Sequence, residues 1–279
     1  ESFGESAATN YYLFVGRPQA FATGTGGGTD ASPPTPLDNV GRNLSYYRDM
    51  MSAARISSSD IAYAIPRNDW TTGTVYDYYR HDYGETVNSA TVQTVASGTD
   101  LFASGTNFVV KSADNNVYKC MWNNGGAAST VEPTGTATTE LTTGDSYVWK
   151  YMYSLSSTQA ANFLTSDFMA VATDSTVAAA AVDGGVNRYH IANGGAGYTN
   201  NTYTAQALKG DGTSATFTVV VSGGAVTSVT SVAAGTGYTF ADCKIDSISG
   251  IGSPSTSAVV TPIIGPKGGH GKDAVTELG

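Results

Sequence analysis

The sequence predicts a mainly β protein with a β-sandwich-like core, a small α-helical lobe and an inserted small β module. Three observations lead to this prediction. Glycine, serine, threonine, alanine, valine and tyrosine are abundant among the 279 residues, and β-branched and hydroxyl side chains suit half-solvated strands joined by turns. Apolar and polar residues alternate in several segments with the period of a strand. A short motif of glycine and tyrosine occurs twice in the later part of the chain.

The N-terminal region begins with a short apolar strand at residues 11–16, which Gly16 ends. A loop rich in glycine, serine and proline follows, and helical spacing appears after it. One face of the expected helix carries Val40, Leu44, Tyr47, Met51 and Ala54. This spacing predicts a helical lobe near residues 38–55, with Asp38 as its cap.

Alternation typical of strands runs through much of the chain from residue 69 onward. Within residues 146–155 the aromatic side chains share one face of the expected strand, and they are Tyr147, Trp149, Tyr151 and Tyr153. Residues 116–122 alternate in the same way, with Cys120 on the side of the aromatic residues. A brief helix is expected at residues 156–164, capped by Ser156 or Ser157.

The motif G-x-G-Y-T occurs within residues 194–201 and again within residues 234–242. Between the two copies, Ser222-Gly223-Gly224 separates two alternating segments and predicts a hairpin, because glycine accepts the positive φ of a tight turn. These features predict a small β-repeat module that is inserted into the core. The expected domains are a core at 1–185, the module at 186–246 and a return to the core at 247–279.

Charge and cysteine content limit the classes of partner. The net charge is −9, only 13% of residues are charged, and the basic residues are scattered, so nucleic acid is not an expected partner. No apolar run reaches the roughly 18 residues of a membrane span, so no membrane association is expected. Cys120 and Cys243 lie in apolar, strand-like segments, where a free cysteine is typically a small buried hydrophobic residue.

Residues 263–273 read IIGPKGGHGKD and are similar to a phosphate-binding loop. That loop needs a glycine where this chain has Pro266, and a hydroxyl residue where it has Asp273. Proline removes a backbone donor, and an aspartate repels phosphate. We therefore expect a glycine-dependent turn, in which the backbone conformation or a close subunit contact requires Gly268, Gly269 and Gly271.

No complete catalytic or metal-binding pattern is found in the sequence, so we expect no enzyme activity, no cofactor and no metal site. His81, His190 and His270 lie in unrelated segments without zinc-ligand spacing. There is no G-x-S-x-G motif and no cysteine beside an obvious base. The acidic and aromatic residues 76–85 lack calcium-ligand spacing, and an exposed loop or a protein-contact surface is expected there.

Five segments in order resemble one family, and they read YLFVGRPQAF, DIAYAIPRNDW, NVYKCMWNN, TTGDSYVWKYMYSLS and GPKGGHGKDAVTELG. The chain resembles the baseplate wedge subunit of T4-like contractile-tailed bacteriophages, in the branch that includes cyanophages. The resemblance implies a virion structural protein of the tail baseplate, assembled in the host cytoplasm. It also implies a homodimer without catalysis, which joins other wedge proteins and moves with them on tail contraction. The module at 186–246 has no counterpart in the T4 version.

The resemblance marks several positions as candidate structural or interface residues, namely Arg17, Arg67, Asp69, Trp70, Asp145, Trp149, Tyr151, Gly268, Gly269 and Gly271. Arg17 and Arg67 each follow an apolar strand and precede a turn. A planar guanidinium at such a place can bridge carbonyl or carboxylate groups of its own or a neighbouring subunit.

Two other functions remain open at this stage. A carbohydrate-binding or receptor-contact β protein of a phage tail is the first, because the chain has tyrosine-rich loops and the G-x-G-Y-T motif. The second is a tail-associated glycosidase, since Glu132, Glu140 and Asp145 are close in the chain and paired carboxylates hydrolyse glycosidic bonds.

Overall fold

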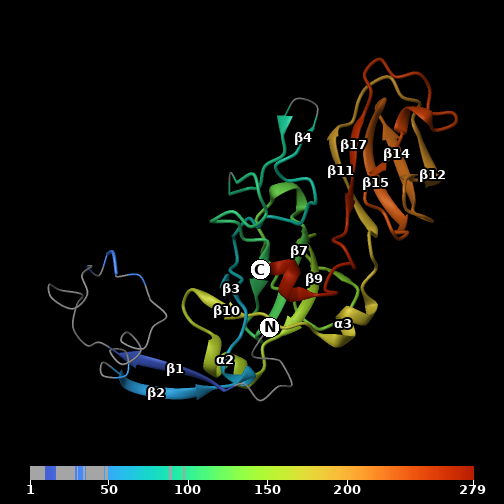
Figure 1. Ribbon diagram of the computed structural model, residues 1–279. Helices are drawn as coiled ribbons and strands as arrows, with labels where there is room; N and C mark the ends of the chain where they lie inside the picture. Colours follow the sequence, from blue (N-terminus) through green and yellow to red (C-terminus); the bar gives the residue numbers. More distant parts are fainter. Residues whose placement is uncertain are drawn as a thin grey trace. The chain divides into compact units, whose positions relative to one another are not determined.

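The computed structural model describes residues 10–16, 29, 31–33, 35, 47, 50–87, 90–96 and 98–279. The chain forms two compact units, residues 1–62 and residues 63–279. Figure 1 shows their strands and short helices, and the mainly β architecture that the sequence predicts is confirmed.

In the first unit, strand β1 (Tyr11–Gly16) pairs with strand β2 (Met50–Ile56) to form an antiparallel ribbon, which Figure 1 shows in blue. A 3₁₀ turn, η2 (Ser58–Asp60), follows. The helical lobe expected near residues 38–55 lies largely outside the described residues, although Tyr47 is helical. The prediction is wrong for residues 50–55, because their backbone pairs with β1. Pairing with a strand distant in sequence outweighs the local helical period.

The centre of the second unit is a four-stranded antiparallel sheet in the order β6-β7-β9-β8. Its strands are β6 (Val109–Lys111), β7 (Asn116–Trp122), β8 (Glu140–Thr142) and β9 (Val148–Ser154). Residues 148–153 of β9 are all buried, so both faces of this strand are covered. The aromatic face expected from the alternation is therefore one of two buried faces. A first hydrophobic cluster forms around this sheet.

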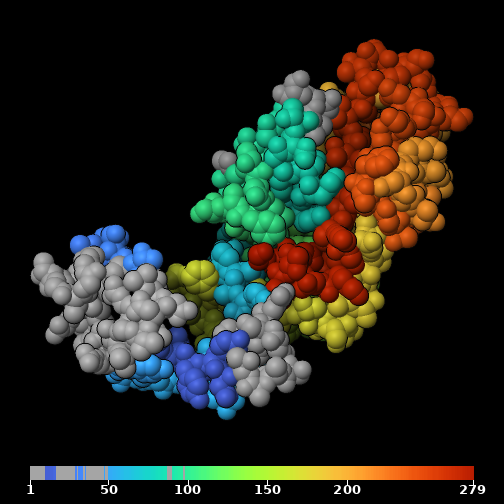
Figure 2. Space-filling view, in the orientation of Figure 1, coloured from blue at the N-terminus to red at the C-terminus, as the bar shows by residue number. Residues whose placement is uncertain are grey.

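Short elements surround the central sheet. Helix α2 (Ser157–Phe163) begins where the sequence predicts it, since Ser156 and Gln159 cap each other's backbone N–H groups. The other elements are β3 (Ala64–Pro66) paired with β10 (Phe168–Ala170), β4 (Thr86–Val87) paired with β5 (Ala90–Thr91), η3 (Asn124–Gly126), α3 (Ser175–Ala180) and α4 (Ala274–Leu278). Ala274 and Leu278 of α4 belong to the first cluster, and Figure 2 shows this C-terminal segment in red.

A second hydrophobic cluster is built from the later strands, which are orange and red in Figure 1. Its strands are β11 (Val186–Asn193) paired with β17 (Val259–Ile264), the sheet of β12 (Asn201–Ala207), β14 (Thr216–Ser222) and β15 (Ala225–Ala233), and β13 (Lys209–Gly210) paired with β16 (Ala241–Asp242). The 3₁₀ turn η4 (Ile245–Ser247) follows β16. The predicted hairpin is confirmed, since β14 and β15 are joined by Gly223 and Gly224 with φ values of 64° and 79°.

The two G-x-G-Y-T segments have the same structural role. Each contains two glycines with positive φ followed by a buried tyrosine, Tyr198 or Tyr238. The Tyr198 hydroxyl accepts the backbone N–H of Ala258 at 2.7 Å, and the Tyr238 hydroxyl accepts that of Ala215 at 3.3 Å. The motif thus makes a turn whose tyrosine fills the second cluster and satisfies a distant backbone donor.

The second cluster extends past residue 246, where the sequence places the end of the module. Ile248, Ile251 and Ile264 all pack in this cluster. The backbone N–H of Gly265 donates to the carbonyl of Gly185 at 2.9 Å. The chain therefore leaves the region of the first cluster and returns to it at adjacent points.

The acidic and aromatic run at residues 76–85 joins the two clusters of the second unit. The Tyr79 hydroxyl donates to the Ile264 carbonyl at 3.1 Å, and the Ile264 N–H donates to Nδ1 of His81 at 3.1 Å. The hydroxyl of Tyr78 lies 3.1 Å from Nδ1 of His190. Six residues from Tyr76 to Asp82 are buried, so the expectation of an exposed loop is wrong for most of this run. Internal partners satisfy its polar groups, as the Arg80–Asp82 ion pair shows.

Candidate functional site

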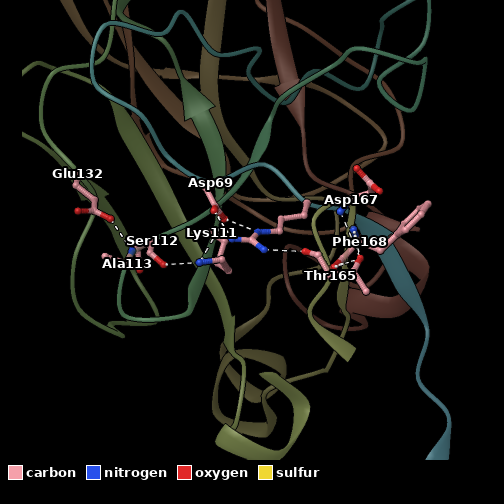
Figure 3. A network of polar contacts seen from close by, with 9 residues as sticks. Asp69, Lys111, Ser112, Ala113, Glu132, Thr165, Asp167 and Phe168 are labelled. Carbon is pink, nitrogen blue, oxygen red and sulfur yellow. Dashed lines mark hydrogen bonds and ion pairs between the residues drawn. The ribbon is translucent and has the colours of Figure 1, made fainter. Parts of the chain in front are cut away.

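Arg67 follows β3 and binds Asp69 and Thr165, two of the residues labelled in the polar network of Figure 3. Its Nε and Nη2 donate to the two carboxylate oxygens of Asp69 at 3.0 and 2.5 Å, and its Nη1 donates to the Thr165 carbonyl at 2.7 Å. The planar guanidinium therefore joins the segment after β3 to the segment before β10. Such a two-point contact with a carboxylate requires arginine and cannot be reproduced by lysine.

Lys111 extends this network to strand β6. Its Nζ lies 3.3 Å from Oδ1 of Asp69 and donates to the Ser112 carbonyl at 3.2 Å. Hydrogen bonds from Arg67 lower the pKa of Asp69, and the nearby Lys111 charge adds to this effect. The Asp69 hydrogen bonds raise the pKa of Arg67. Both groups of the Arg67–Asp69 pair remain partly exposed, so this pair lies at the surface, and Asp69 is shared between the charges of Arg67 and Lys111.

Trp70 and Asp145 hold neighbouring loops. Nε1 of Trp70 donates to the Ser129 hydroxyl at 3.1 Å. The Ser129 hydroxyl donates to Asp145 at 3.0 Å, and the carboxylate of Asp145 also accepts the backbone N–H groups of Thr130 and Val131. Burial opposes ionisation of Asp145, but a hydrogen bond from the Thr143 hydroxyl, together with those from Thr130, Val131 and Ser129, lowers its pKa to about 2. Asp145 is thus a structural anion.

Trp149 and Tyr151 lie on β9 with different surroundings. The Trp149 ring is fully buried and stacks on Tyr147 at 5.5 Å between ring centroids. Its Nε1 is buried, and no hydrogen-bond partner for it occurs among the residues that the structure describes. Tyr151 packs edge-on against Tyr118, and its hydroxyl lies 2.7 Å from that of Ser154. Both residues contribute to the core of the second unit.

The glycines of residues 268–271 form a turn that closes against α3 and the segment after it. Gly268, Gly269 and Gly271 have φ values of 82°, 91° and 81°. A Cβ atom on Gly269 would lie 2.4 Å from the backbone nitrogen of Val182, and one on Gly271 would lie 2.4 Å from Cγ1 of Val177. Both the positive φ and the close packing require glycine.

Asp273 lies just after this turn and caps α4. Its carboxylate accepts the backbone N–H groups of Val275 and Thr276. In a phosphate loop the ligand itself would use the donors at the start of the helix. The acidic side chain therefore takes the position that a phosphate would need, in agreement with the glycine-turn interpretation.

A buried ionic centre that the sequence reasoning missed lies under the glycine turn. Lys119 of β7 pairs with Glu277 of α4, and the side chain of Lys119 is 0% exposed. Nδ1 of His270 lies 2.5 Å from the Lys119 ammonium, and the N–H of Gly271 donates to Glu277 at 2.5 Å. The Tyr79 ring lies 4.5 Å from the ammonium. The signal in the sequence is a lysine in the middle of an apolar strand, which must find a partner when both faces are covered.

The charge states in this centre follow from burial and pairing. Burial alone would raise the pKa of Glu277, but the charge of Lys119, which also donates a hydrogen bond to this carboxylate, brings it down to about 2. Burial and the neighbouring Lys119 charge lower the pKa of His270 to about 4, so the imidazole is neutral near pH 7. The centre thus contains one ion pair and one neutral ring.

Arg17, the second arginine among the candidate interface residues, lies outside the described residues. Within the described ranges, no group of three or more His, Cys, Asp or Glu side chains could hold a metal ion. No helix in that part of the chain is both long and apolar enough to cross a bilayer. Cys120 and Cys243 are buried free thiols, as the sequence predicts.

A family model described as "Bacteriophage T4, Gp8" matches residues 1–209, about three quarters of the chain. The chain belongs to this family. It is therefore a T4-like baseplate wedge subunit, a structural protein of the phage tail baseplate, and the family indicates association with other baseplate proteins. No curated protein and no solved structure matches the chain.

The match places most of the candidate residues within the Gp8 family region. Arg67, Asp69, Trp70, Asp145, Trp149 and Tyr151 all lie inside residues 1–209. The match ends at β13, inside the second cluster, and does not include the glycine turn at 268–271. The cyanophage branch stays a prediction, since the match does not bear on it.

Proposed function

We propose that this Gp8-family chain forms a homodimer, joins other wedge proteins and moves with them on tail contraction, without a catalytic role. The family match over residues 1–209 is the observation that carries the proposal. The chain acts through its contacts with other subunits and not through a chemical reaction. Assembly takes place in the host cytoplasm, before the baseplate becomes part of the virion. Neither a cofactor nor a nucleic-acid or membrane partner is part of this function.

The β1–β2 ribbon supports an interaction role. Tyr12, Leu13 and Val15 are 64%, 62% and 62% exposed, and Met51 of β2 is 66% exposed. An isolated two-stranded ribbon is marginally stable in water, and exposed apolar side chains in a group are typical of protein interfaces. The ribbon therefore presents the kind of surface that a subunit of an assembly buries.

The three carboxylates considered for glycosidase activity support a structural role instead. Glu132 accepts the N–H of Ala113 at 2.7 Å, and Glu140 pairs with Arg188 at 2.7 Å. Asp145 holds the loop that contains Ser129. Each carboxylate already has internal partners in a different place, whereas a glycosidase needs two that converge on one substrate bond.

The module expected at residues 186–246 is proposed as an insertion that decorates the wedge exterior or contacts a neighbouring tail protein. Its separate hydrophobic cluster and the adjacent positions of Gly185 and Gly265 support this proposal. The alternative, a carbohydrate-binding or receptor-contact role for the tyrosine-rich loops, predicts binding on a glycan array.

The test uses the full chain with its wedge partners. We expect light scattering to give a dimer at micromolar concentration, and co-expressed wedge proteins to co-purify with it. Quantification in intact virions should give a copy number that is a multiple of the sixfold symmetry of the tail. A strict monomer that captures no wedge protein would contradict the proposal, and so would turnover of a polysaccharide.

A further inference from the structure

A buried lysine on the central sheet has no ion-pair partner in the described part of the chain. Lys150 of β9 lies between two charged cross-strand neighbours, Lys119 on β7 and Glu140 on β8. Lys119 is paired with Glu277, and Glu140 is paired with Arg188 at 2.7 Å. Lys150 is 8% exposed, and among the described residues its ammonium donates only to the carbonyl of Thr138.

The local charges do not balance. Three cations lie in this region, Lys119, Lys150 and Arg188, and the described anions beside them are Glu140 and Glu277. A buried cation without a counter-charge is costly, and two like charges on facing positions of adjacent strands repel each other. The cations exceed the anions by one, so one added negative charge would balance the cluster.

A cavity of about 400 Å³ lies next to the unmatched lysine. Its wall includes Lys150 and Thr138, whose carbonyl receives the lysine hydrogen bond, so the ammonium lies at the wall. His270 also lines the cavity. Because Nδ1 of this neutral ring accepts from Lys119, the ring proton is on Nε2, which makes it a second donor.

The rest of the wall defines the kind of anion that fits. Glu140 is part of the wall, and it would repel a second negative charge on a ligand. Apolar side chains line another part of the cavity, among them Ala180, Val182 and Val232. These side chains would contact a short alkyl group. The complementary ligand has one negative charge and a small apolar tail.

We propose that this cavity binds a short aliphatic monocarboxylate, with its carboxylate beside the Lys150 ammonium and Nε2 of His270. The carboxylate supplies the missing negative charge and accepts both donors. The alkyl chain lies along the apolar wall. Since Lys150 and Glu140 lie on the sheet at the centre of the second unit, occupancy would stabilise that unit directly.

The test is isothermal titration calorimetry with butyrate on the full chain, against chloride at equal ionic strength, with inorganic phosphate as the comparison anion. We expect butyrate to bind and phosphate to bind at least about tenfold more weakly. Lys150→Met should abolish the heat of butyrate binding. The matched control, Lys244→Met, removes an exposed lysine that pairs with Asp242 and should bind as the wild type does.

A second variant keeps the test decisive if Lys150→Met does not fold. Glu140→Gln removes the repelling carboxylate and should tighten butyrate binding by about tenfold, the opposite direction from a general loss of structure. No butyrate binding to the wild type would overturn the proposal. So would unchanged binding by Lys150→Met, unchanged or weaker binding by Glu140→Gln, or phosphate binding as tight as that of butyrate.

Discussion

Lys119 and Glu277 form an ion pair shielded from solvent, although 158 residues separate them in the chain. Lys119 lies on a central strand of the main sheet, and Glu277 lies on the last helix. The pair connects the C-terminal segment to the core, with His270 and Gly271 as its other neighbours.

The first prediction concerns this pair. Glu277→Gln leaves the Lys119 ammonium buried without a counter-charge, and we expect the free energy of unfolding to fall by about 3–5 kcal/mol. Urea denaturation of the full chain measures this loss. The control is Glu85→Gln, an exposed carboxylate whose side chain has no ion pair among the described residues.

The paired substitution Lys119→Met with Glu277→Leu removes both charges from the same place. It should recover most of the stability that Glu277→Gln loses, because apolar groups of similar volume replace a buried ion pair at little cost. A Glu277→Gln variant as stable as the wild type would contradict the role of the pair.

The second prediction is a loss of stability in mild acid. Burial lowers the pKa of His190 and of His270 to about 4 from an ordinary value of 6.5. Between these two pH values the unfolded chain binds more protons, so stability is full above about pH 6.5 and declines as the pH falls toward 4. Thermal melts across this range measure the slope.

His190→Gln tests this assignment, because the amide retains a hydrogen-bonding group for Tyr78 and does not titrate. We expect the variant to lose less stability than the wild type between pH 6.5 and 4. An identical slope in both proteins would show that His190 does not contribute. The carboxyl groups of Glu277 and Asp145 have pKa values of about 2. Their protonation therefore lowers stability mainly below pH 4.5 and has little effect between pH 6.5 and 4.5.

The third prediction separates backbone strain from close packing by comparing Gly237 of the second G-x-G-Y-T segment with Gly269 of the glycine turn. Gly237 has a φ of 76° and no atom within 4 Å of an added Cβ, so Gly237→Ala should cost only about 1 kcal/mol of strain. Gly269→Ala adds a clash with the backbone of Val182 and should cost about 2 kcal/mol more. Equal losses of unfolding free energy in the two variants would count against the packing explanation.

The fourth prediction concerns the limits of the inserted module. Replacing residues 186–264 with a short linker between Gly185 and Gly265 should leave the first cluster folded, because these two glycines are joined by a 2.9 Å hydrogen bond. Removing only residues 186–246 should give an aggregating protein, since Ile248 and Ile251 lose their cluster. Circular dichroism melts and light scattering compare the two deletions.

The same deletions test the proposed insertion. The longer deletion should retain the dimer that we propose, whereas loss of the dimer would show that the second cluster belongs to the interface. If the protein without residues 186–246 melts cooperatively and the one without residues 186–264 does not fold, the module ends near residue 246 and not at residue 264.

Much of the local structure was predictable from neighbouring residues alone. Gly223 and Gly224 specify their hairpin because few other residues adopt the required φ. Ser156 and Gln159 specify the start of α2 through reciprocal capping within four residues. The alternation of β9 identified a strand and its aromatic side. The order of short motifs across the chain was enough to recognise the family.

Tertiary structure decided the features that depend on contacts between distant segments. The sequence alone placed residues 50–55 in a helix, but pairing with β1 makes them a strand. Residues 76–85 contain enough charge to suggest a solvated loop, yet packing between the two clusters buries most of them. The Lys119–Glu277 pair and the adjacent glycines at 185 and 265 are likewise products of the fold. Local patterns act over a few residues, whereas burial and charge pairing are set by segments that only the folded chain brings together.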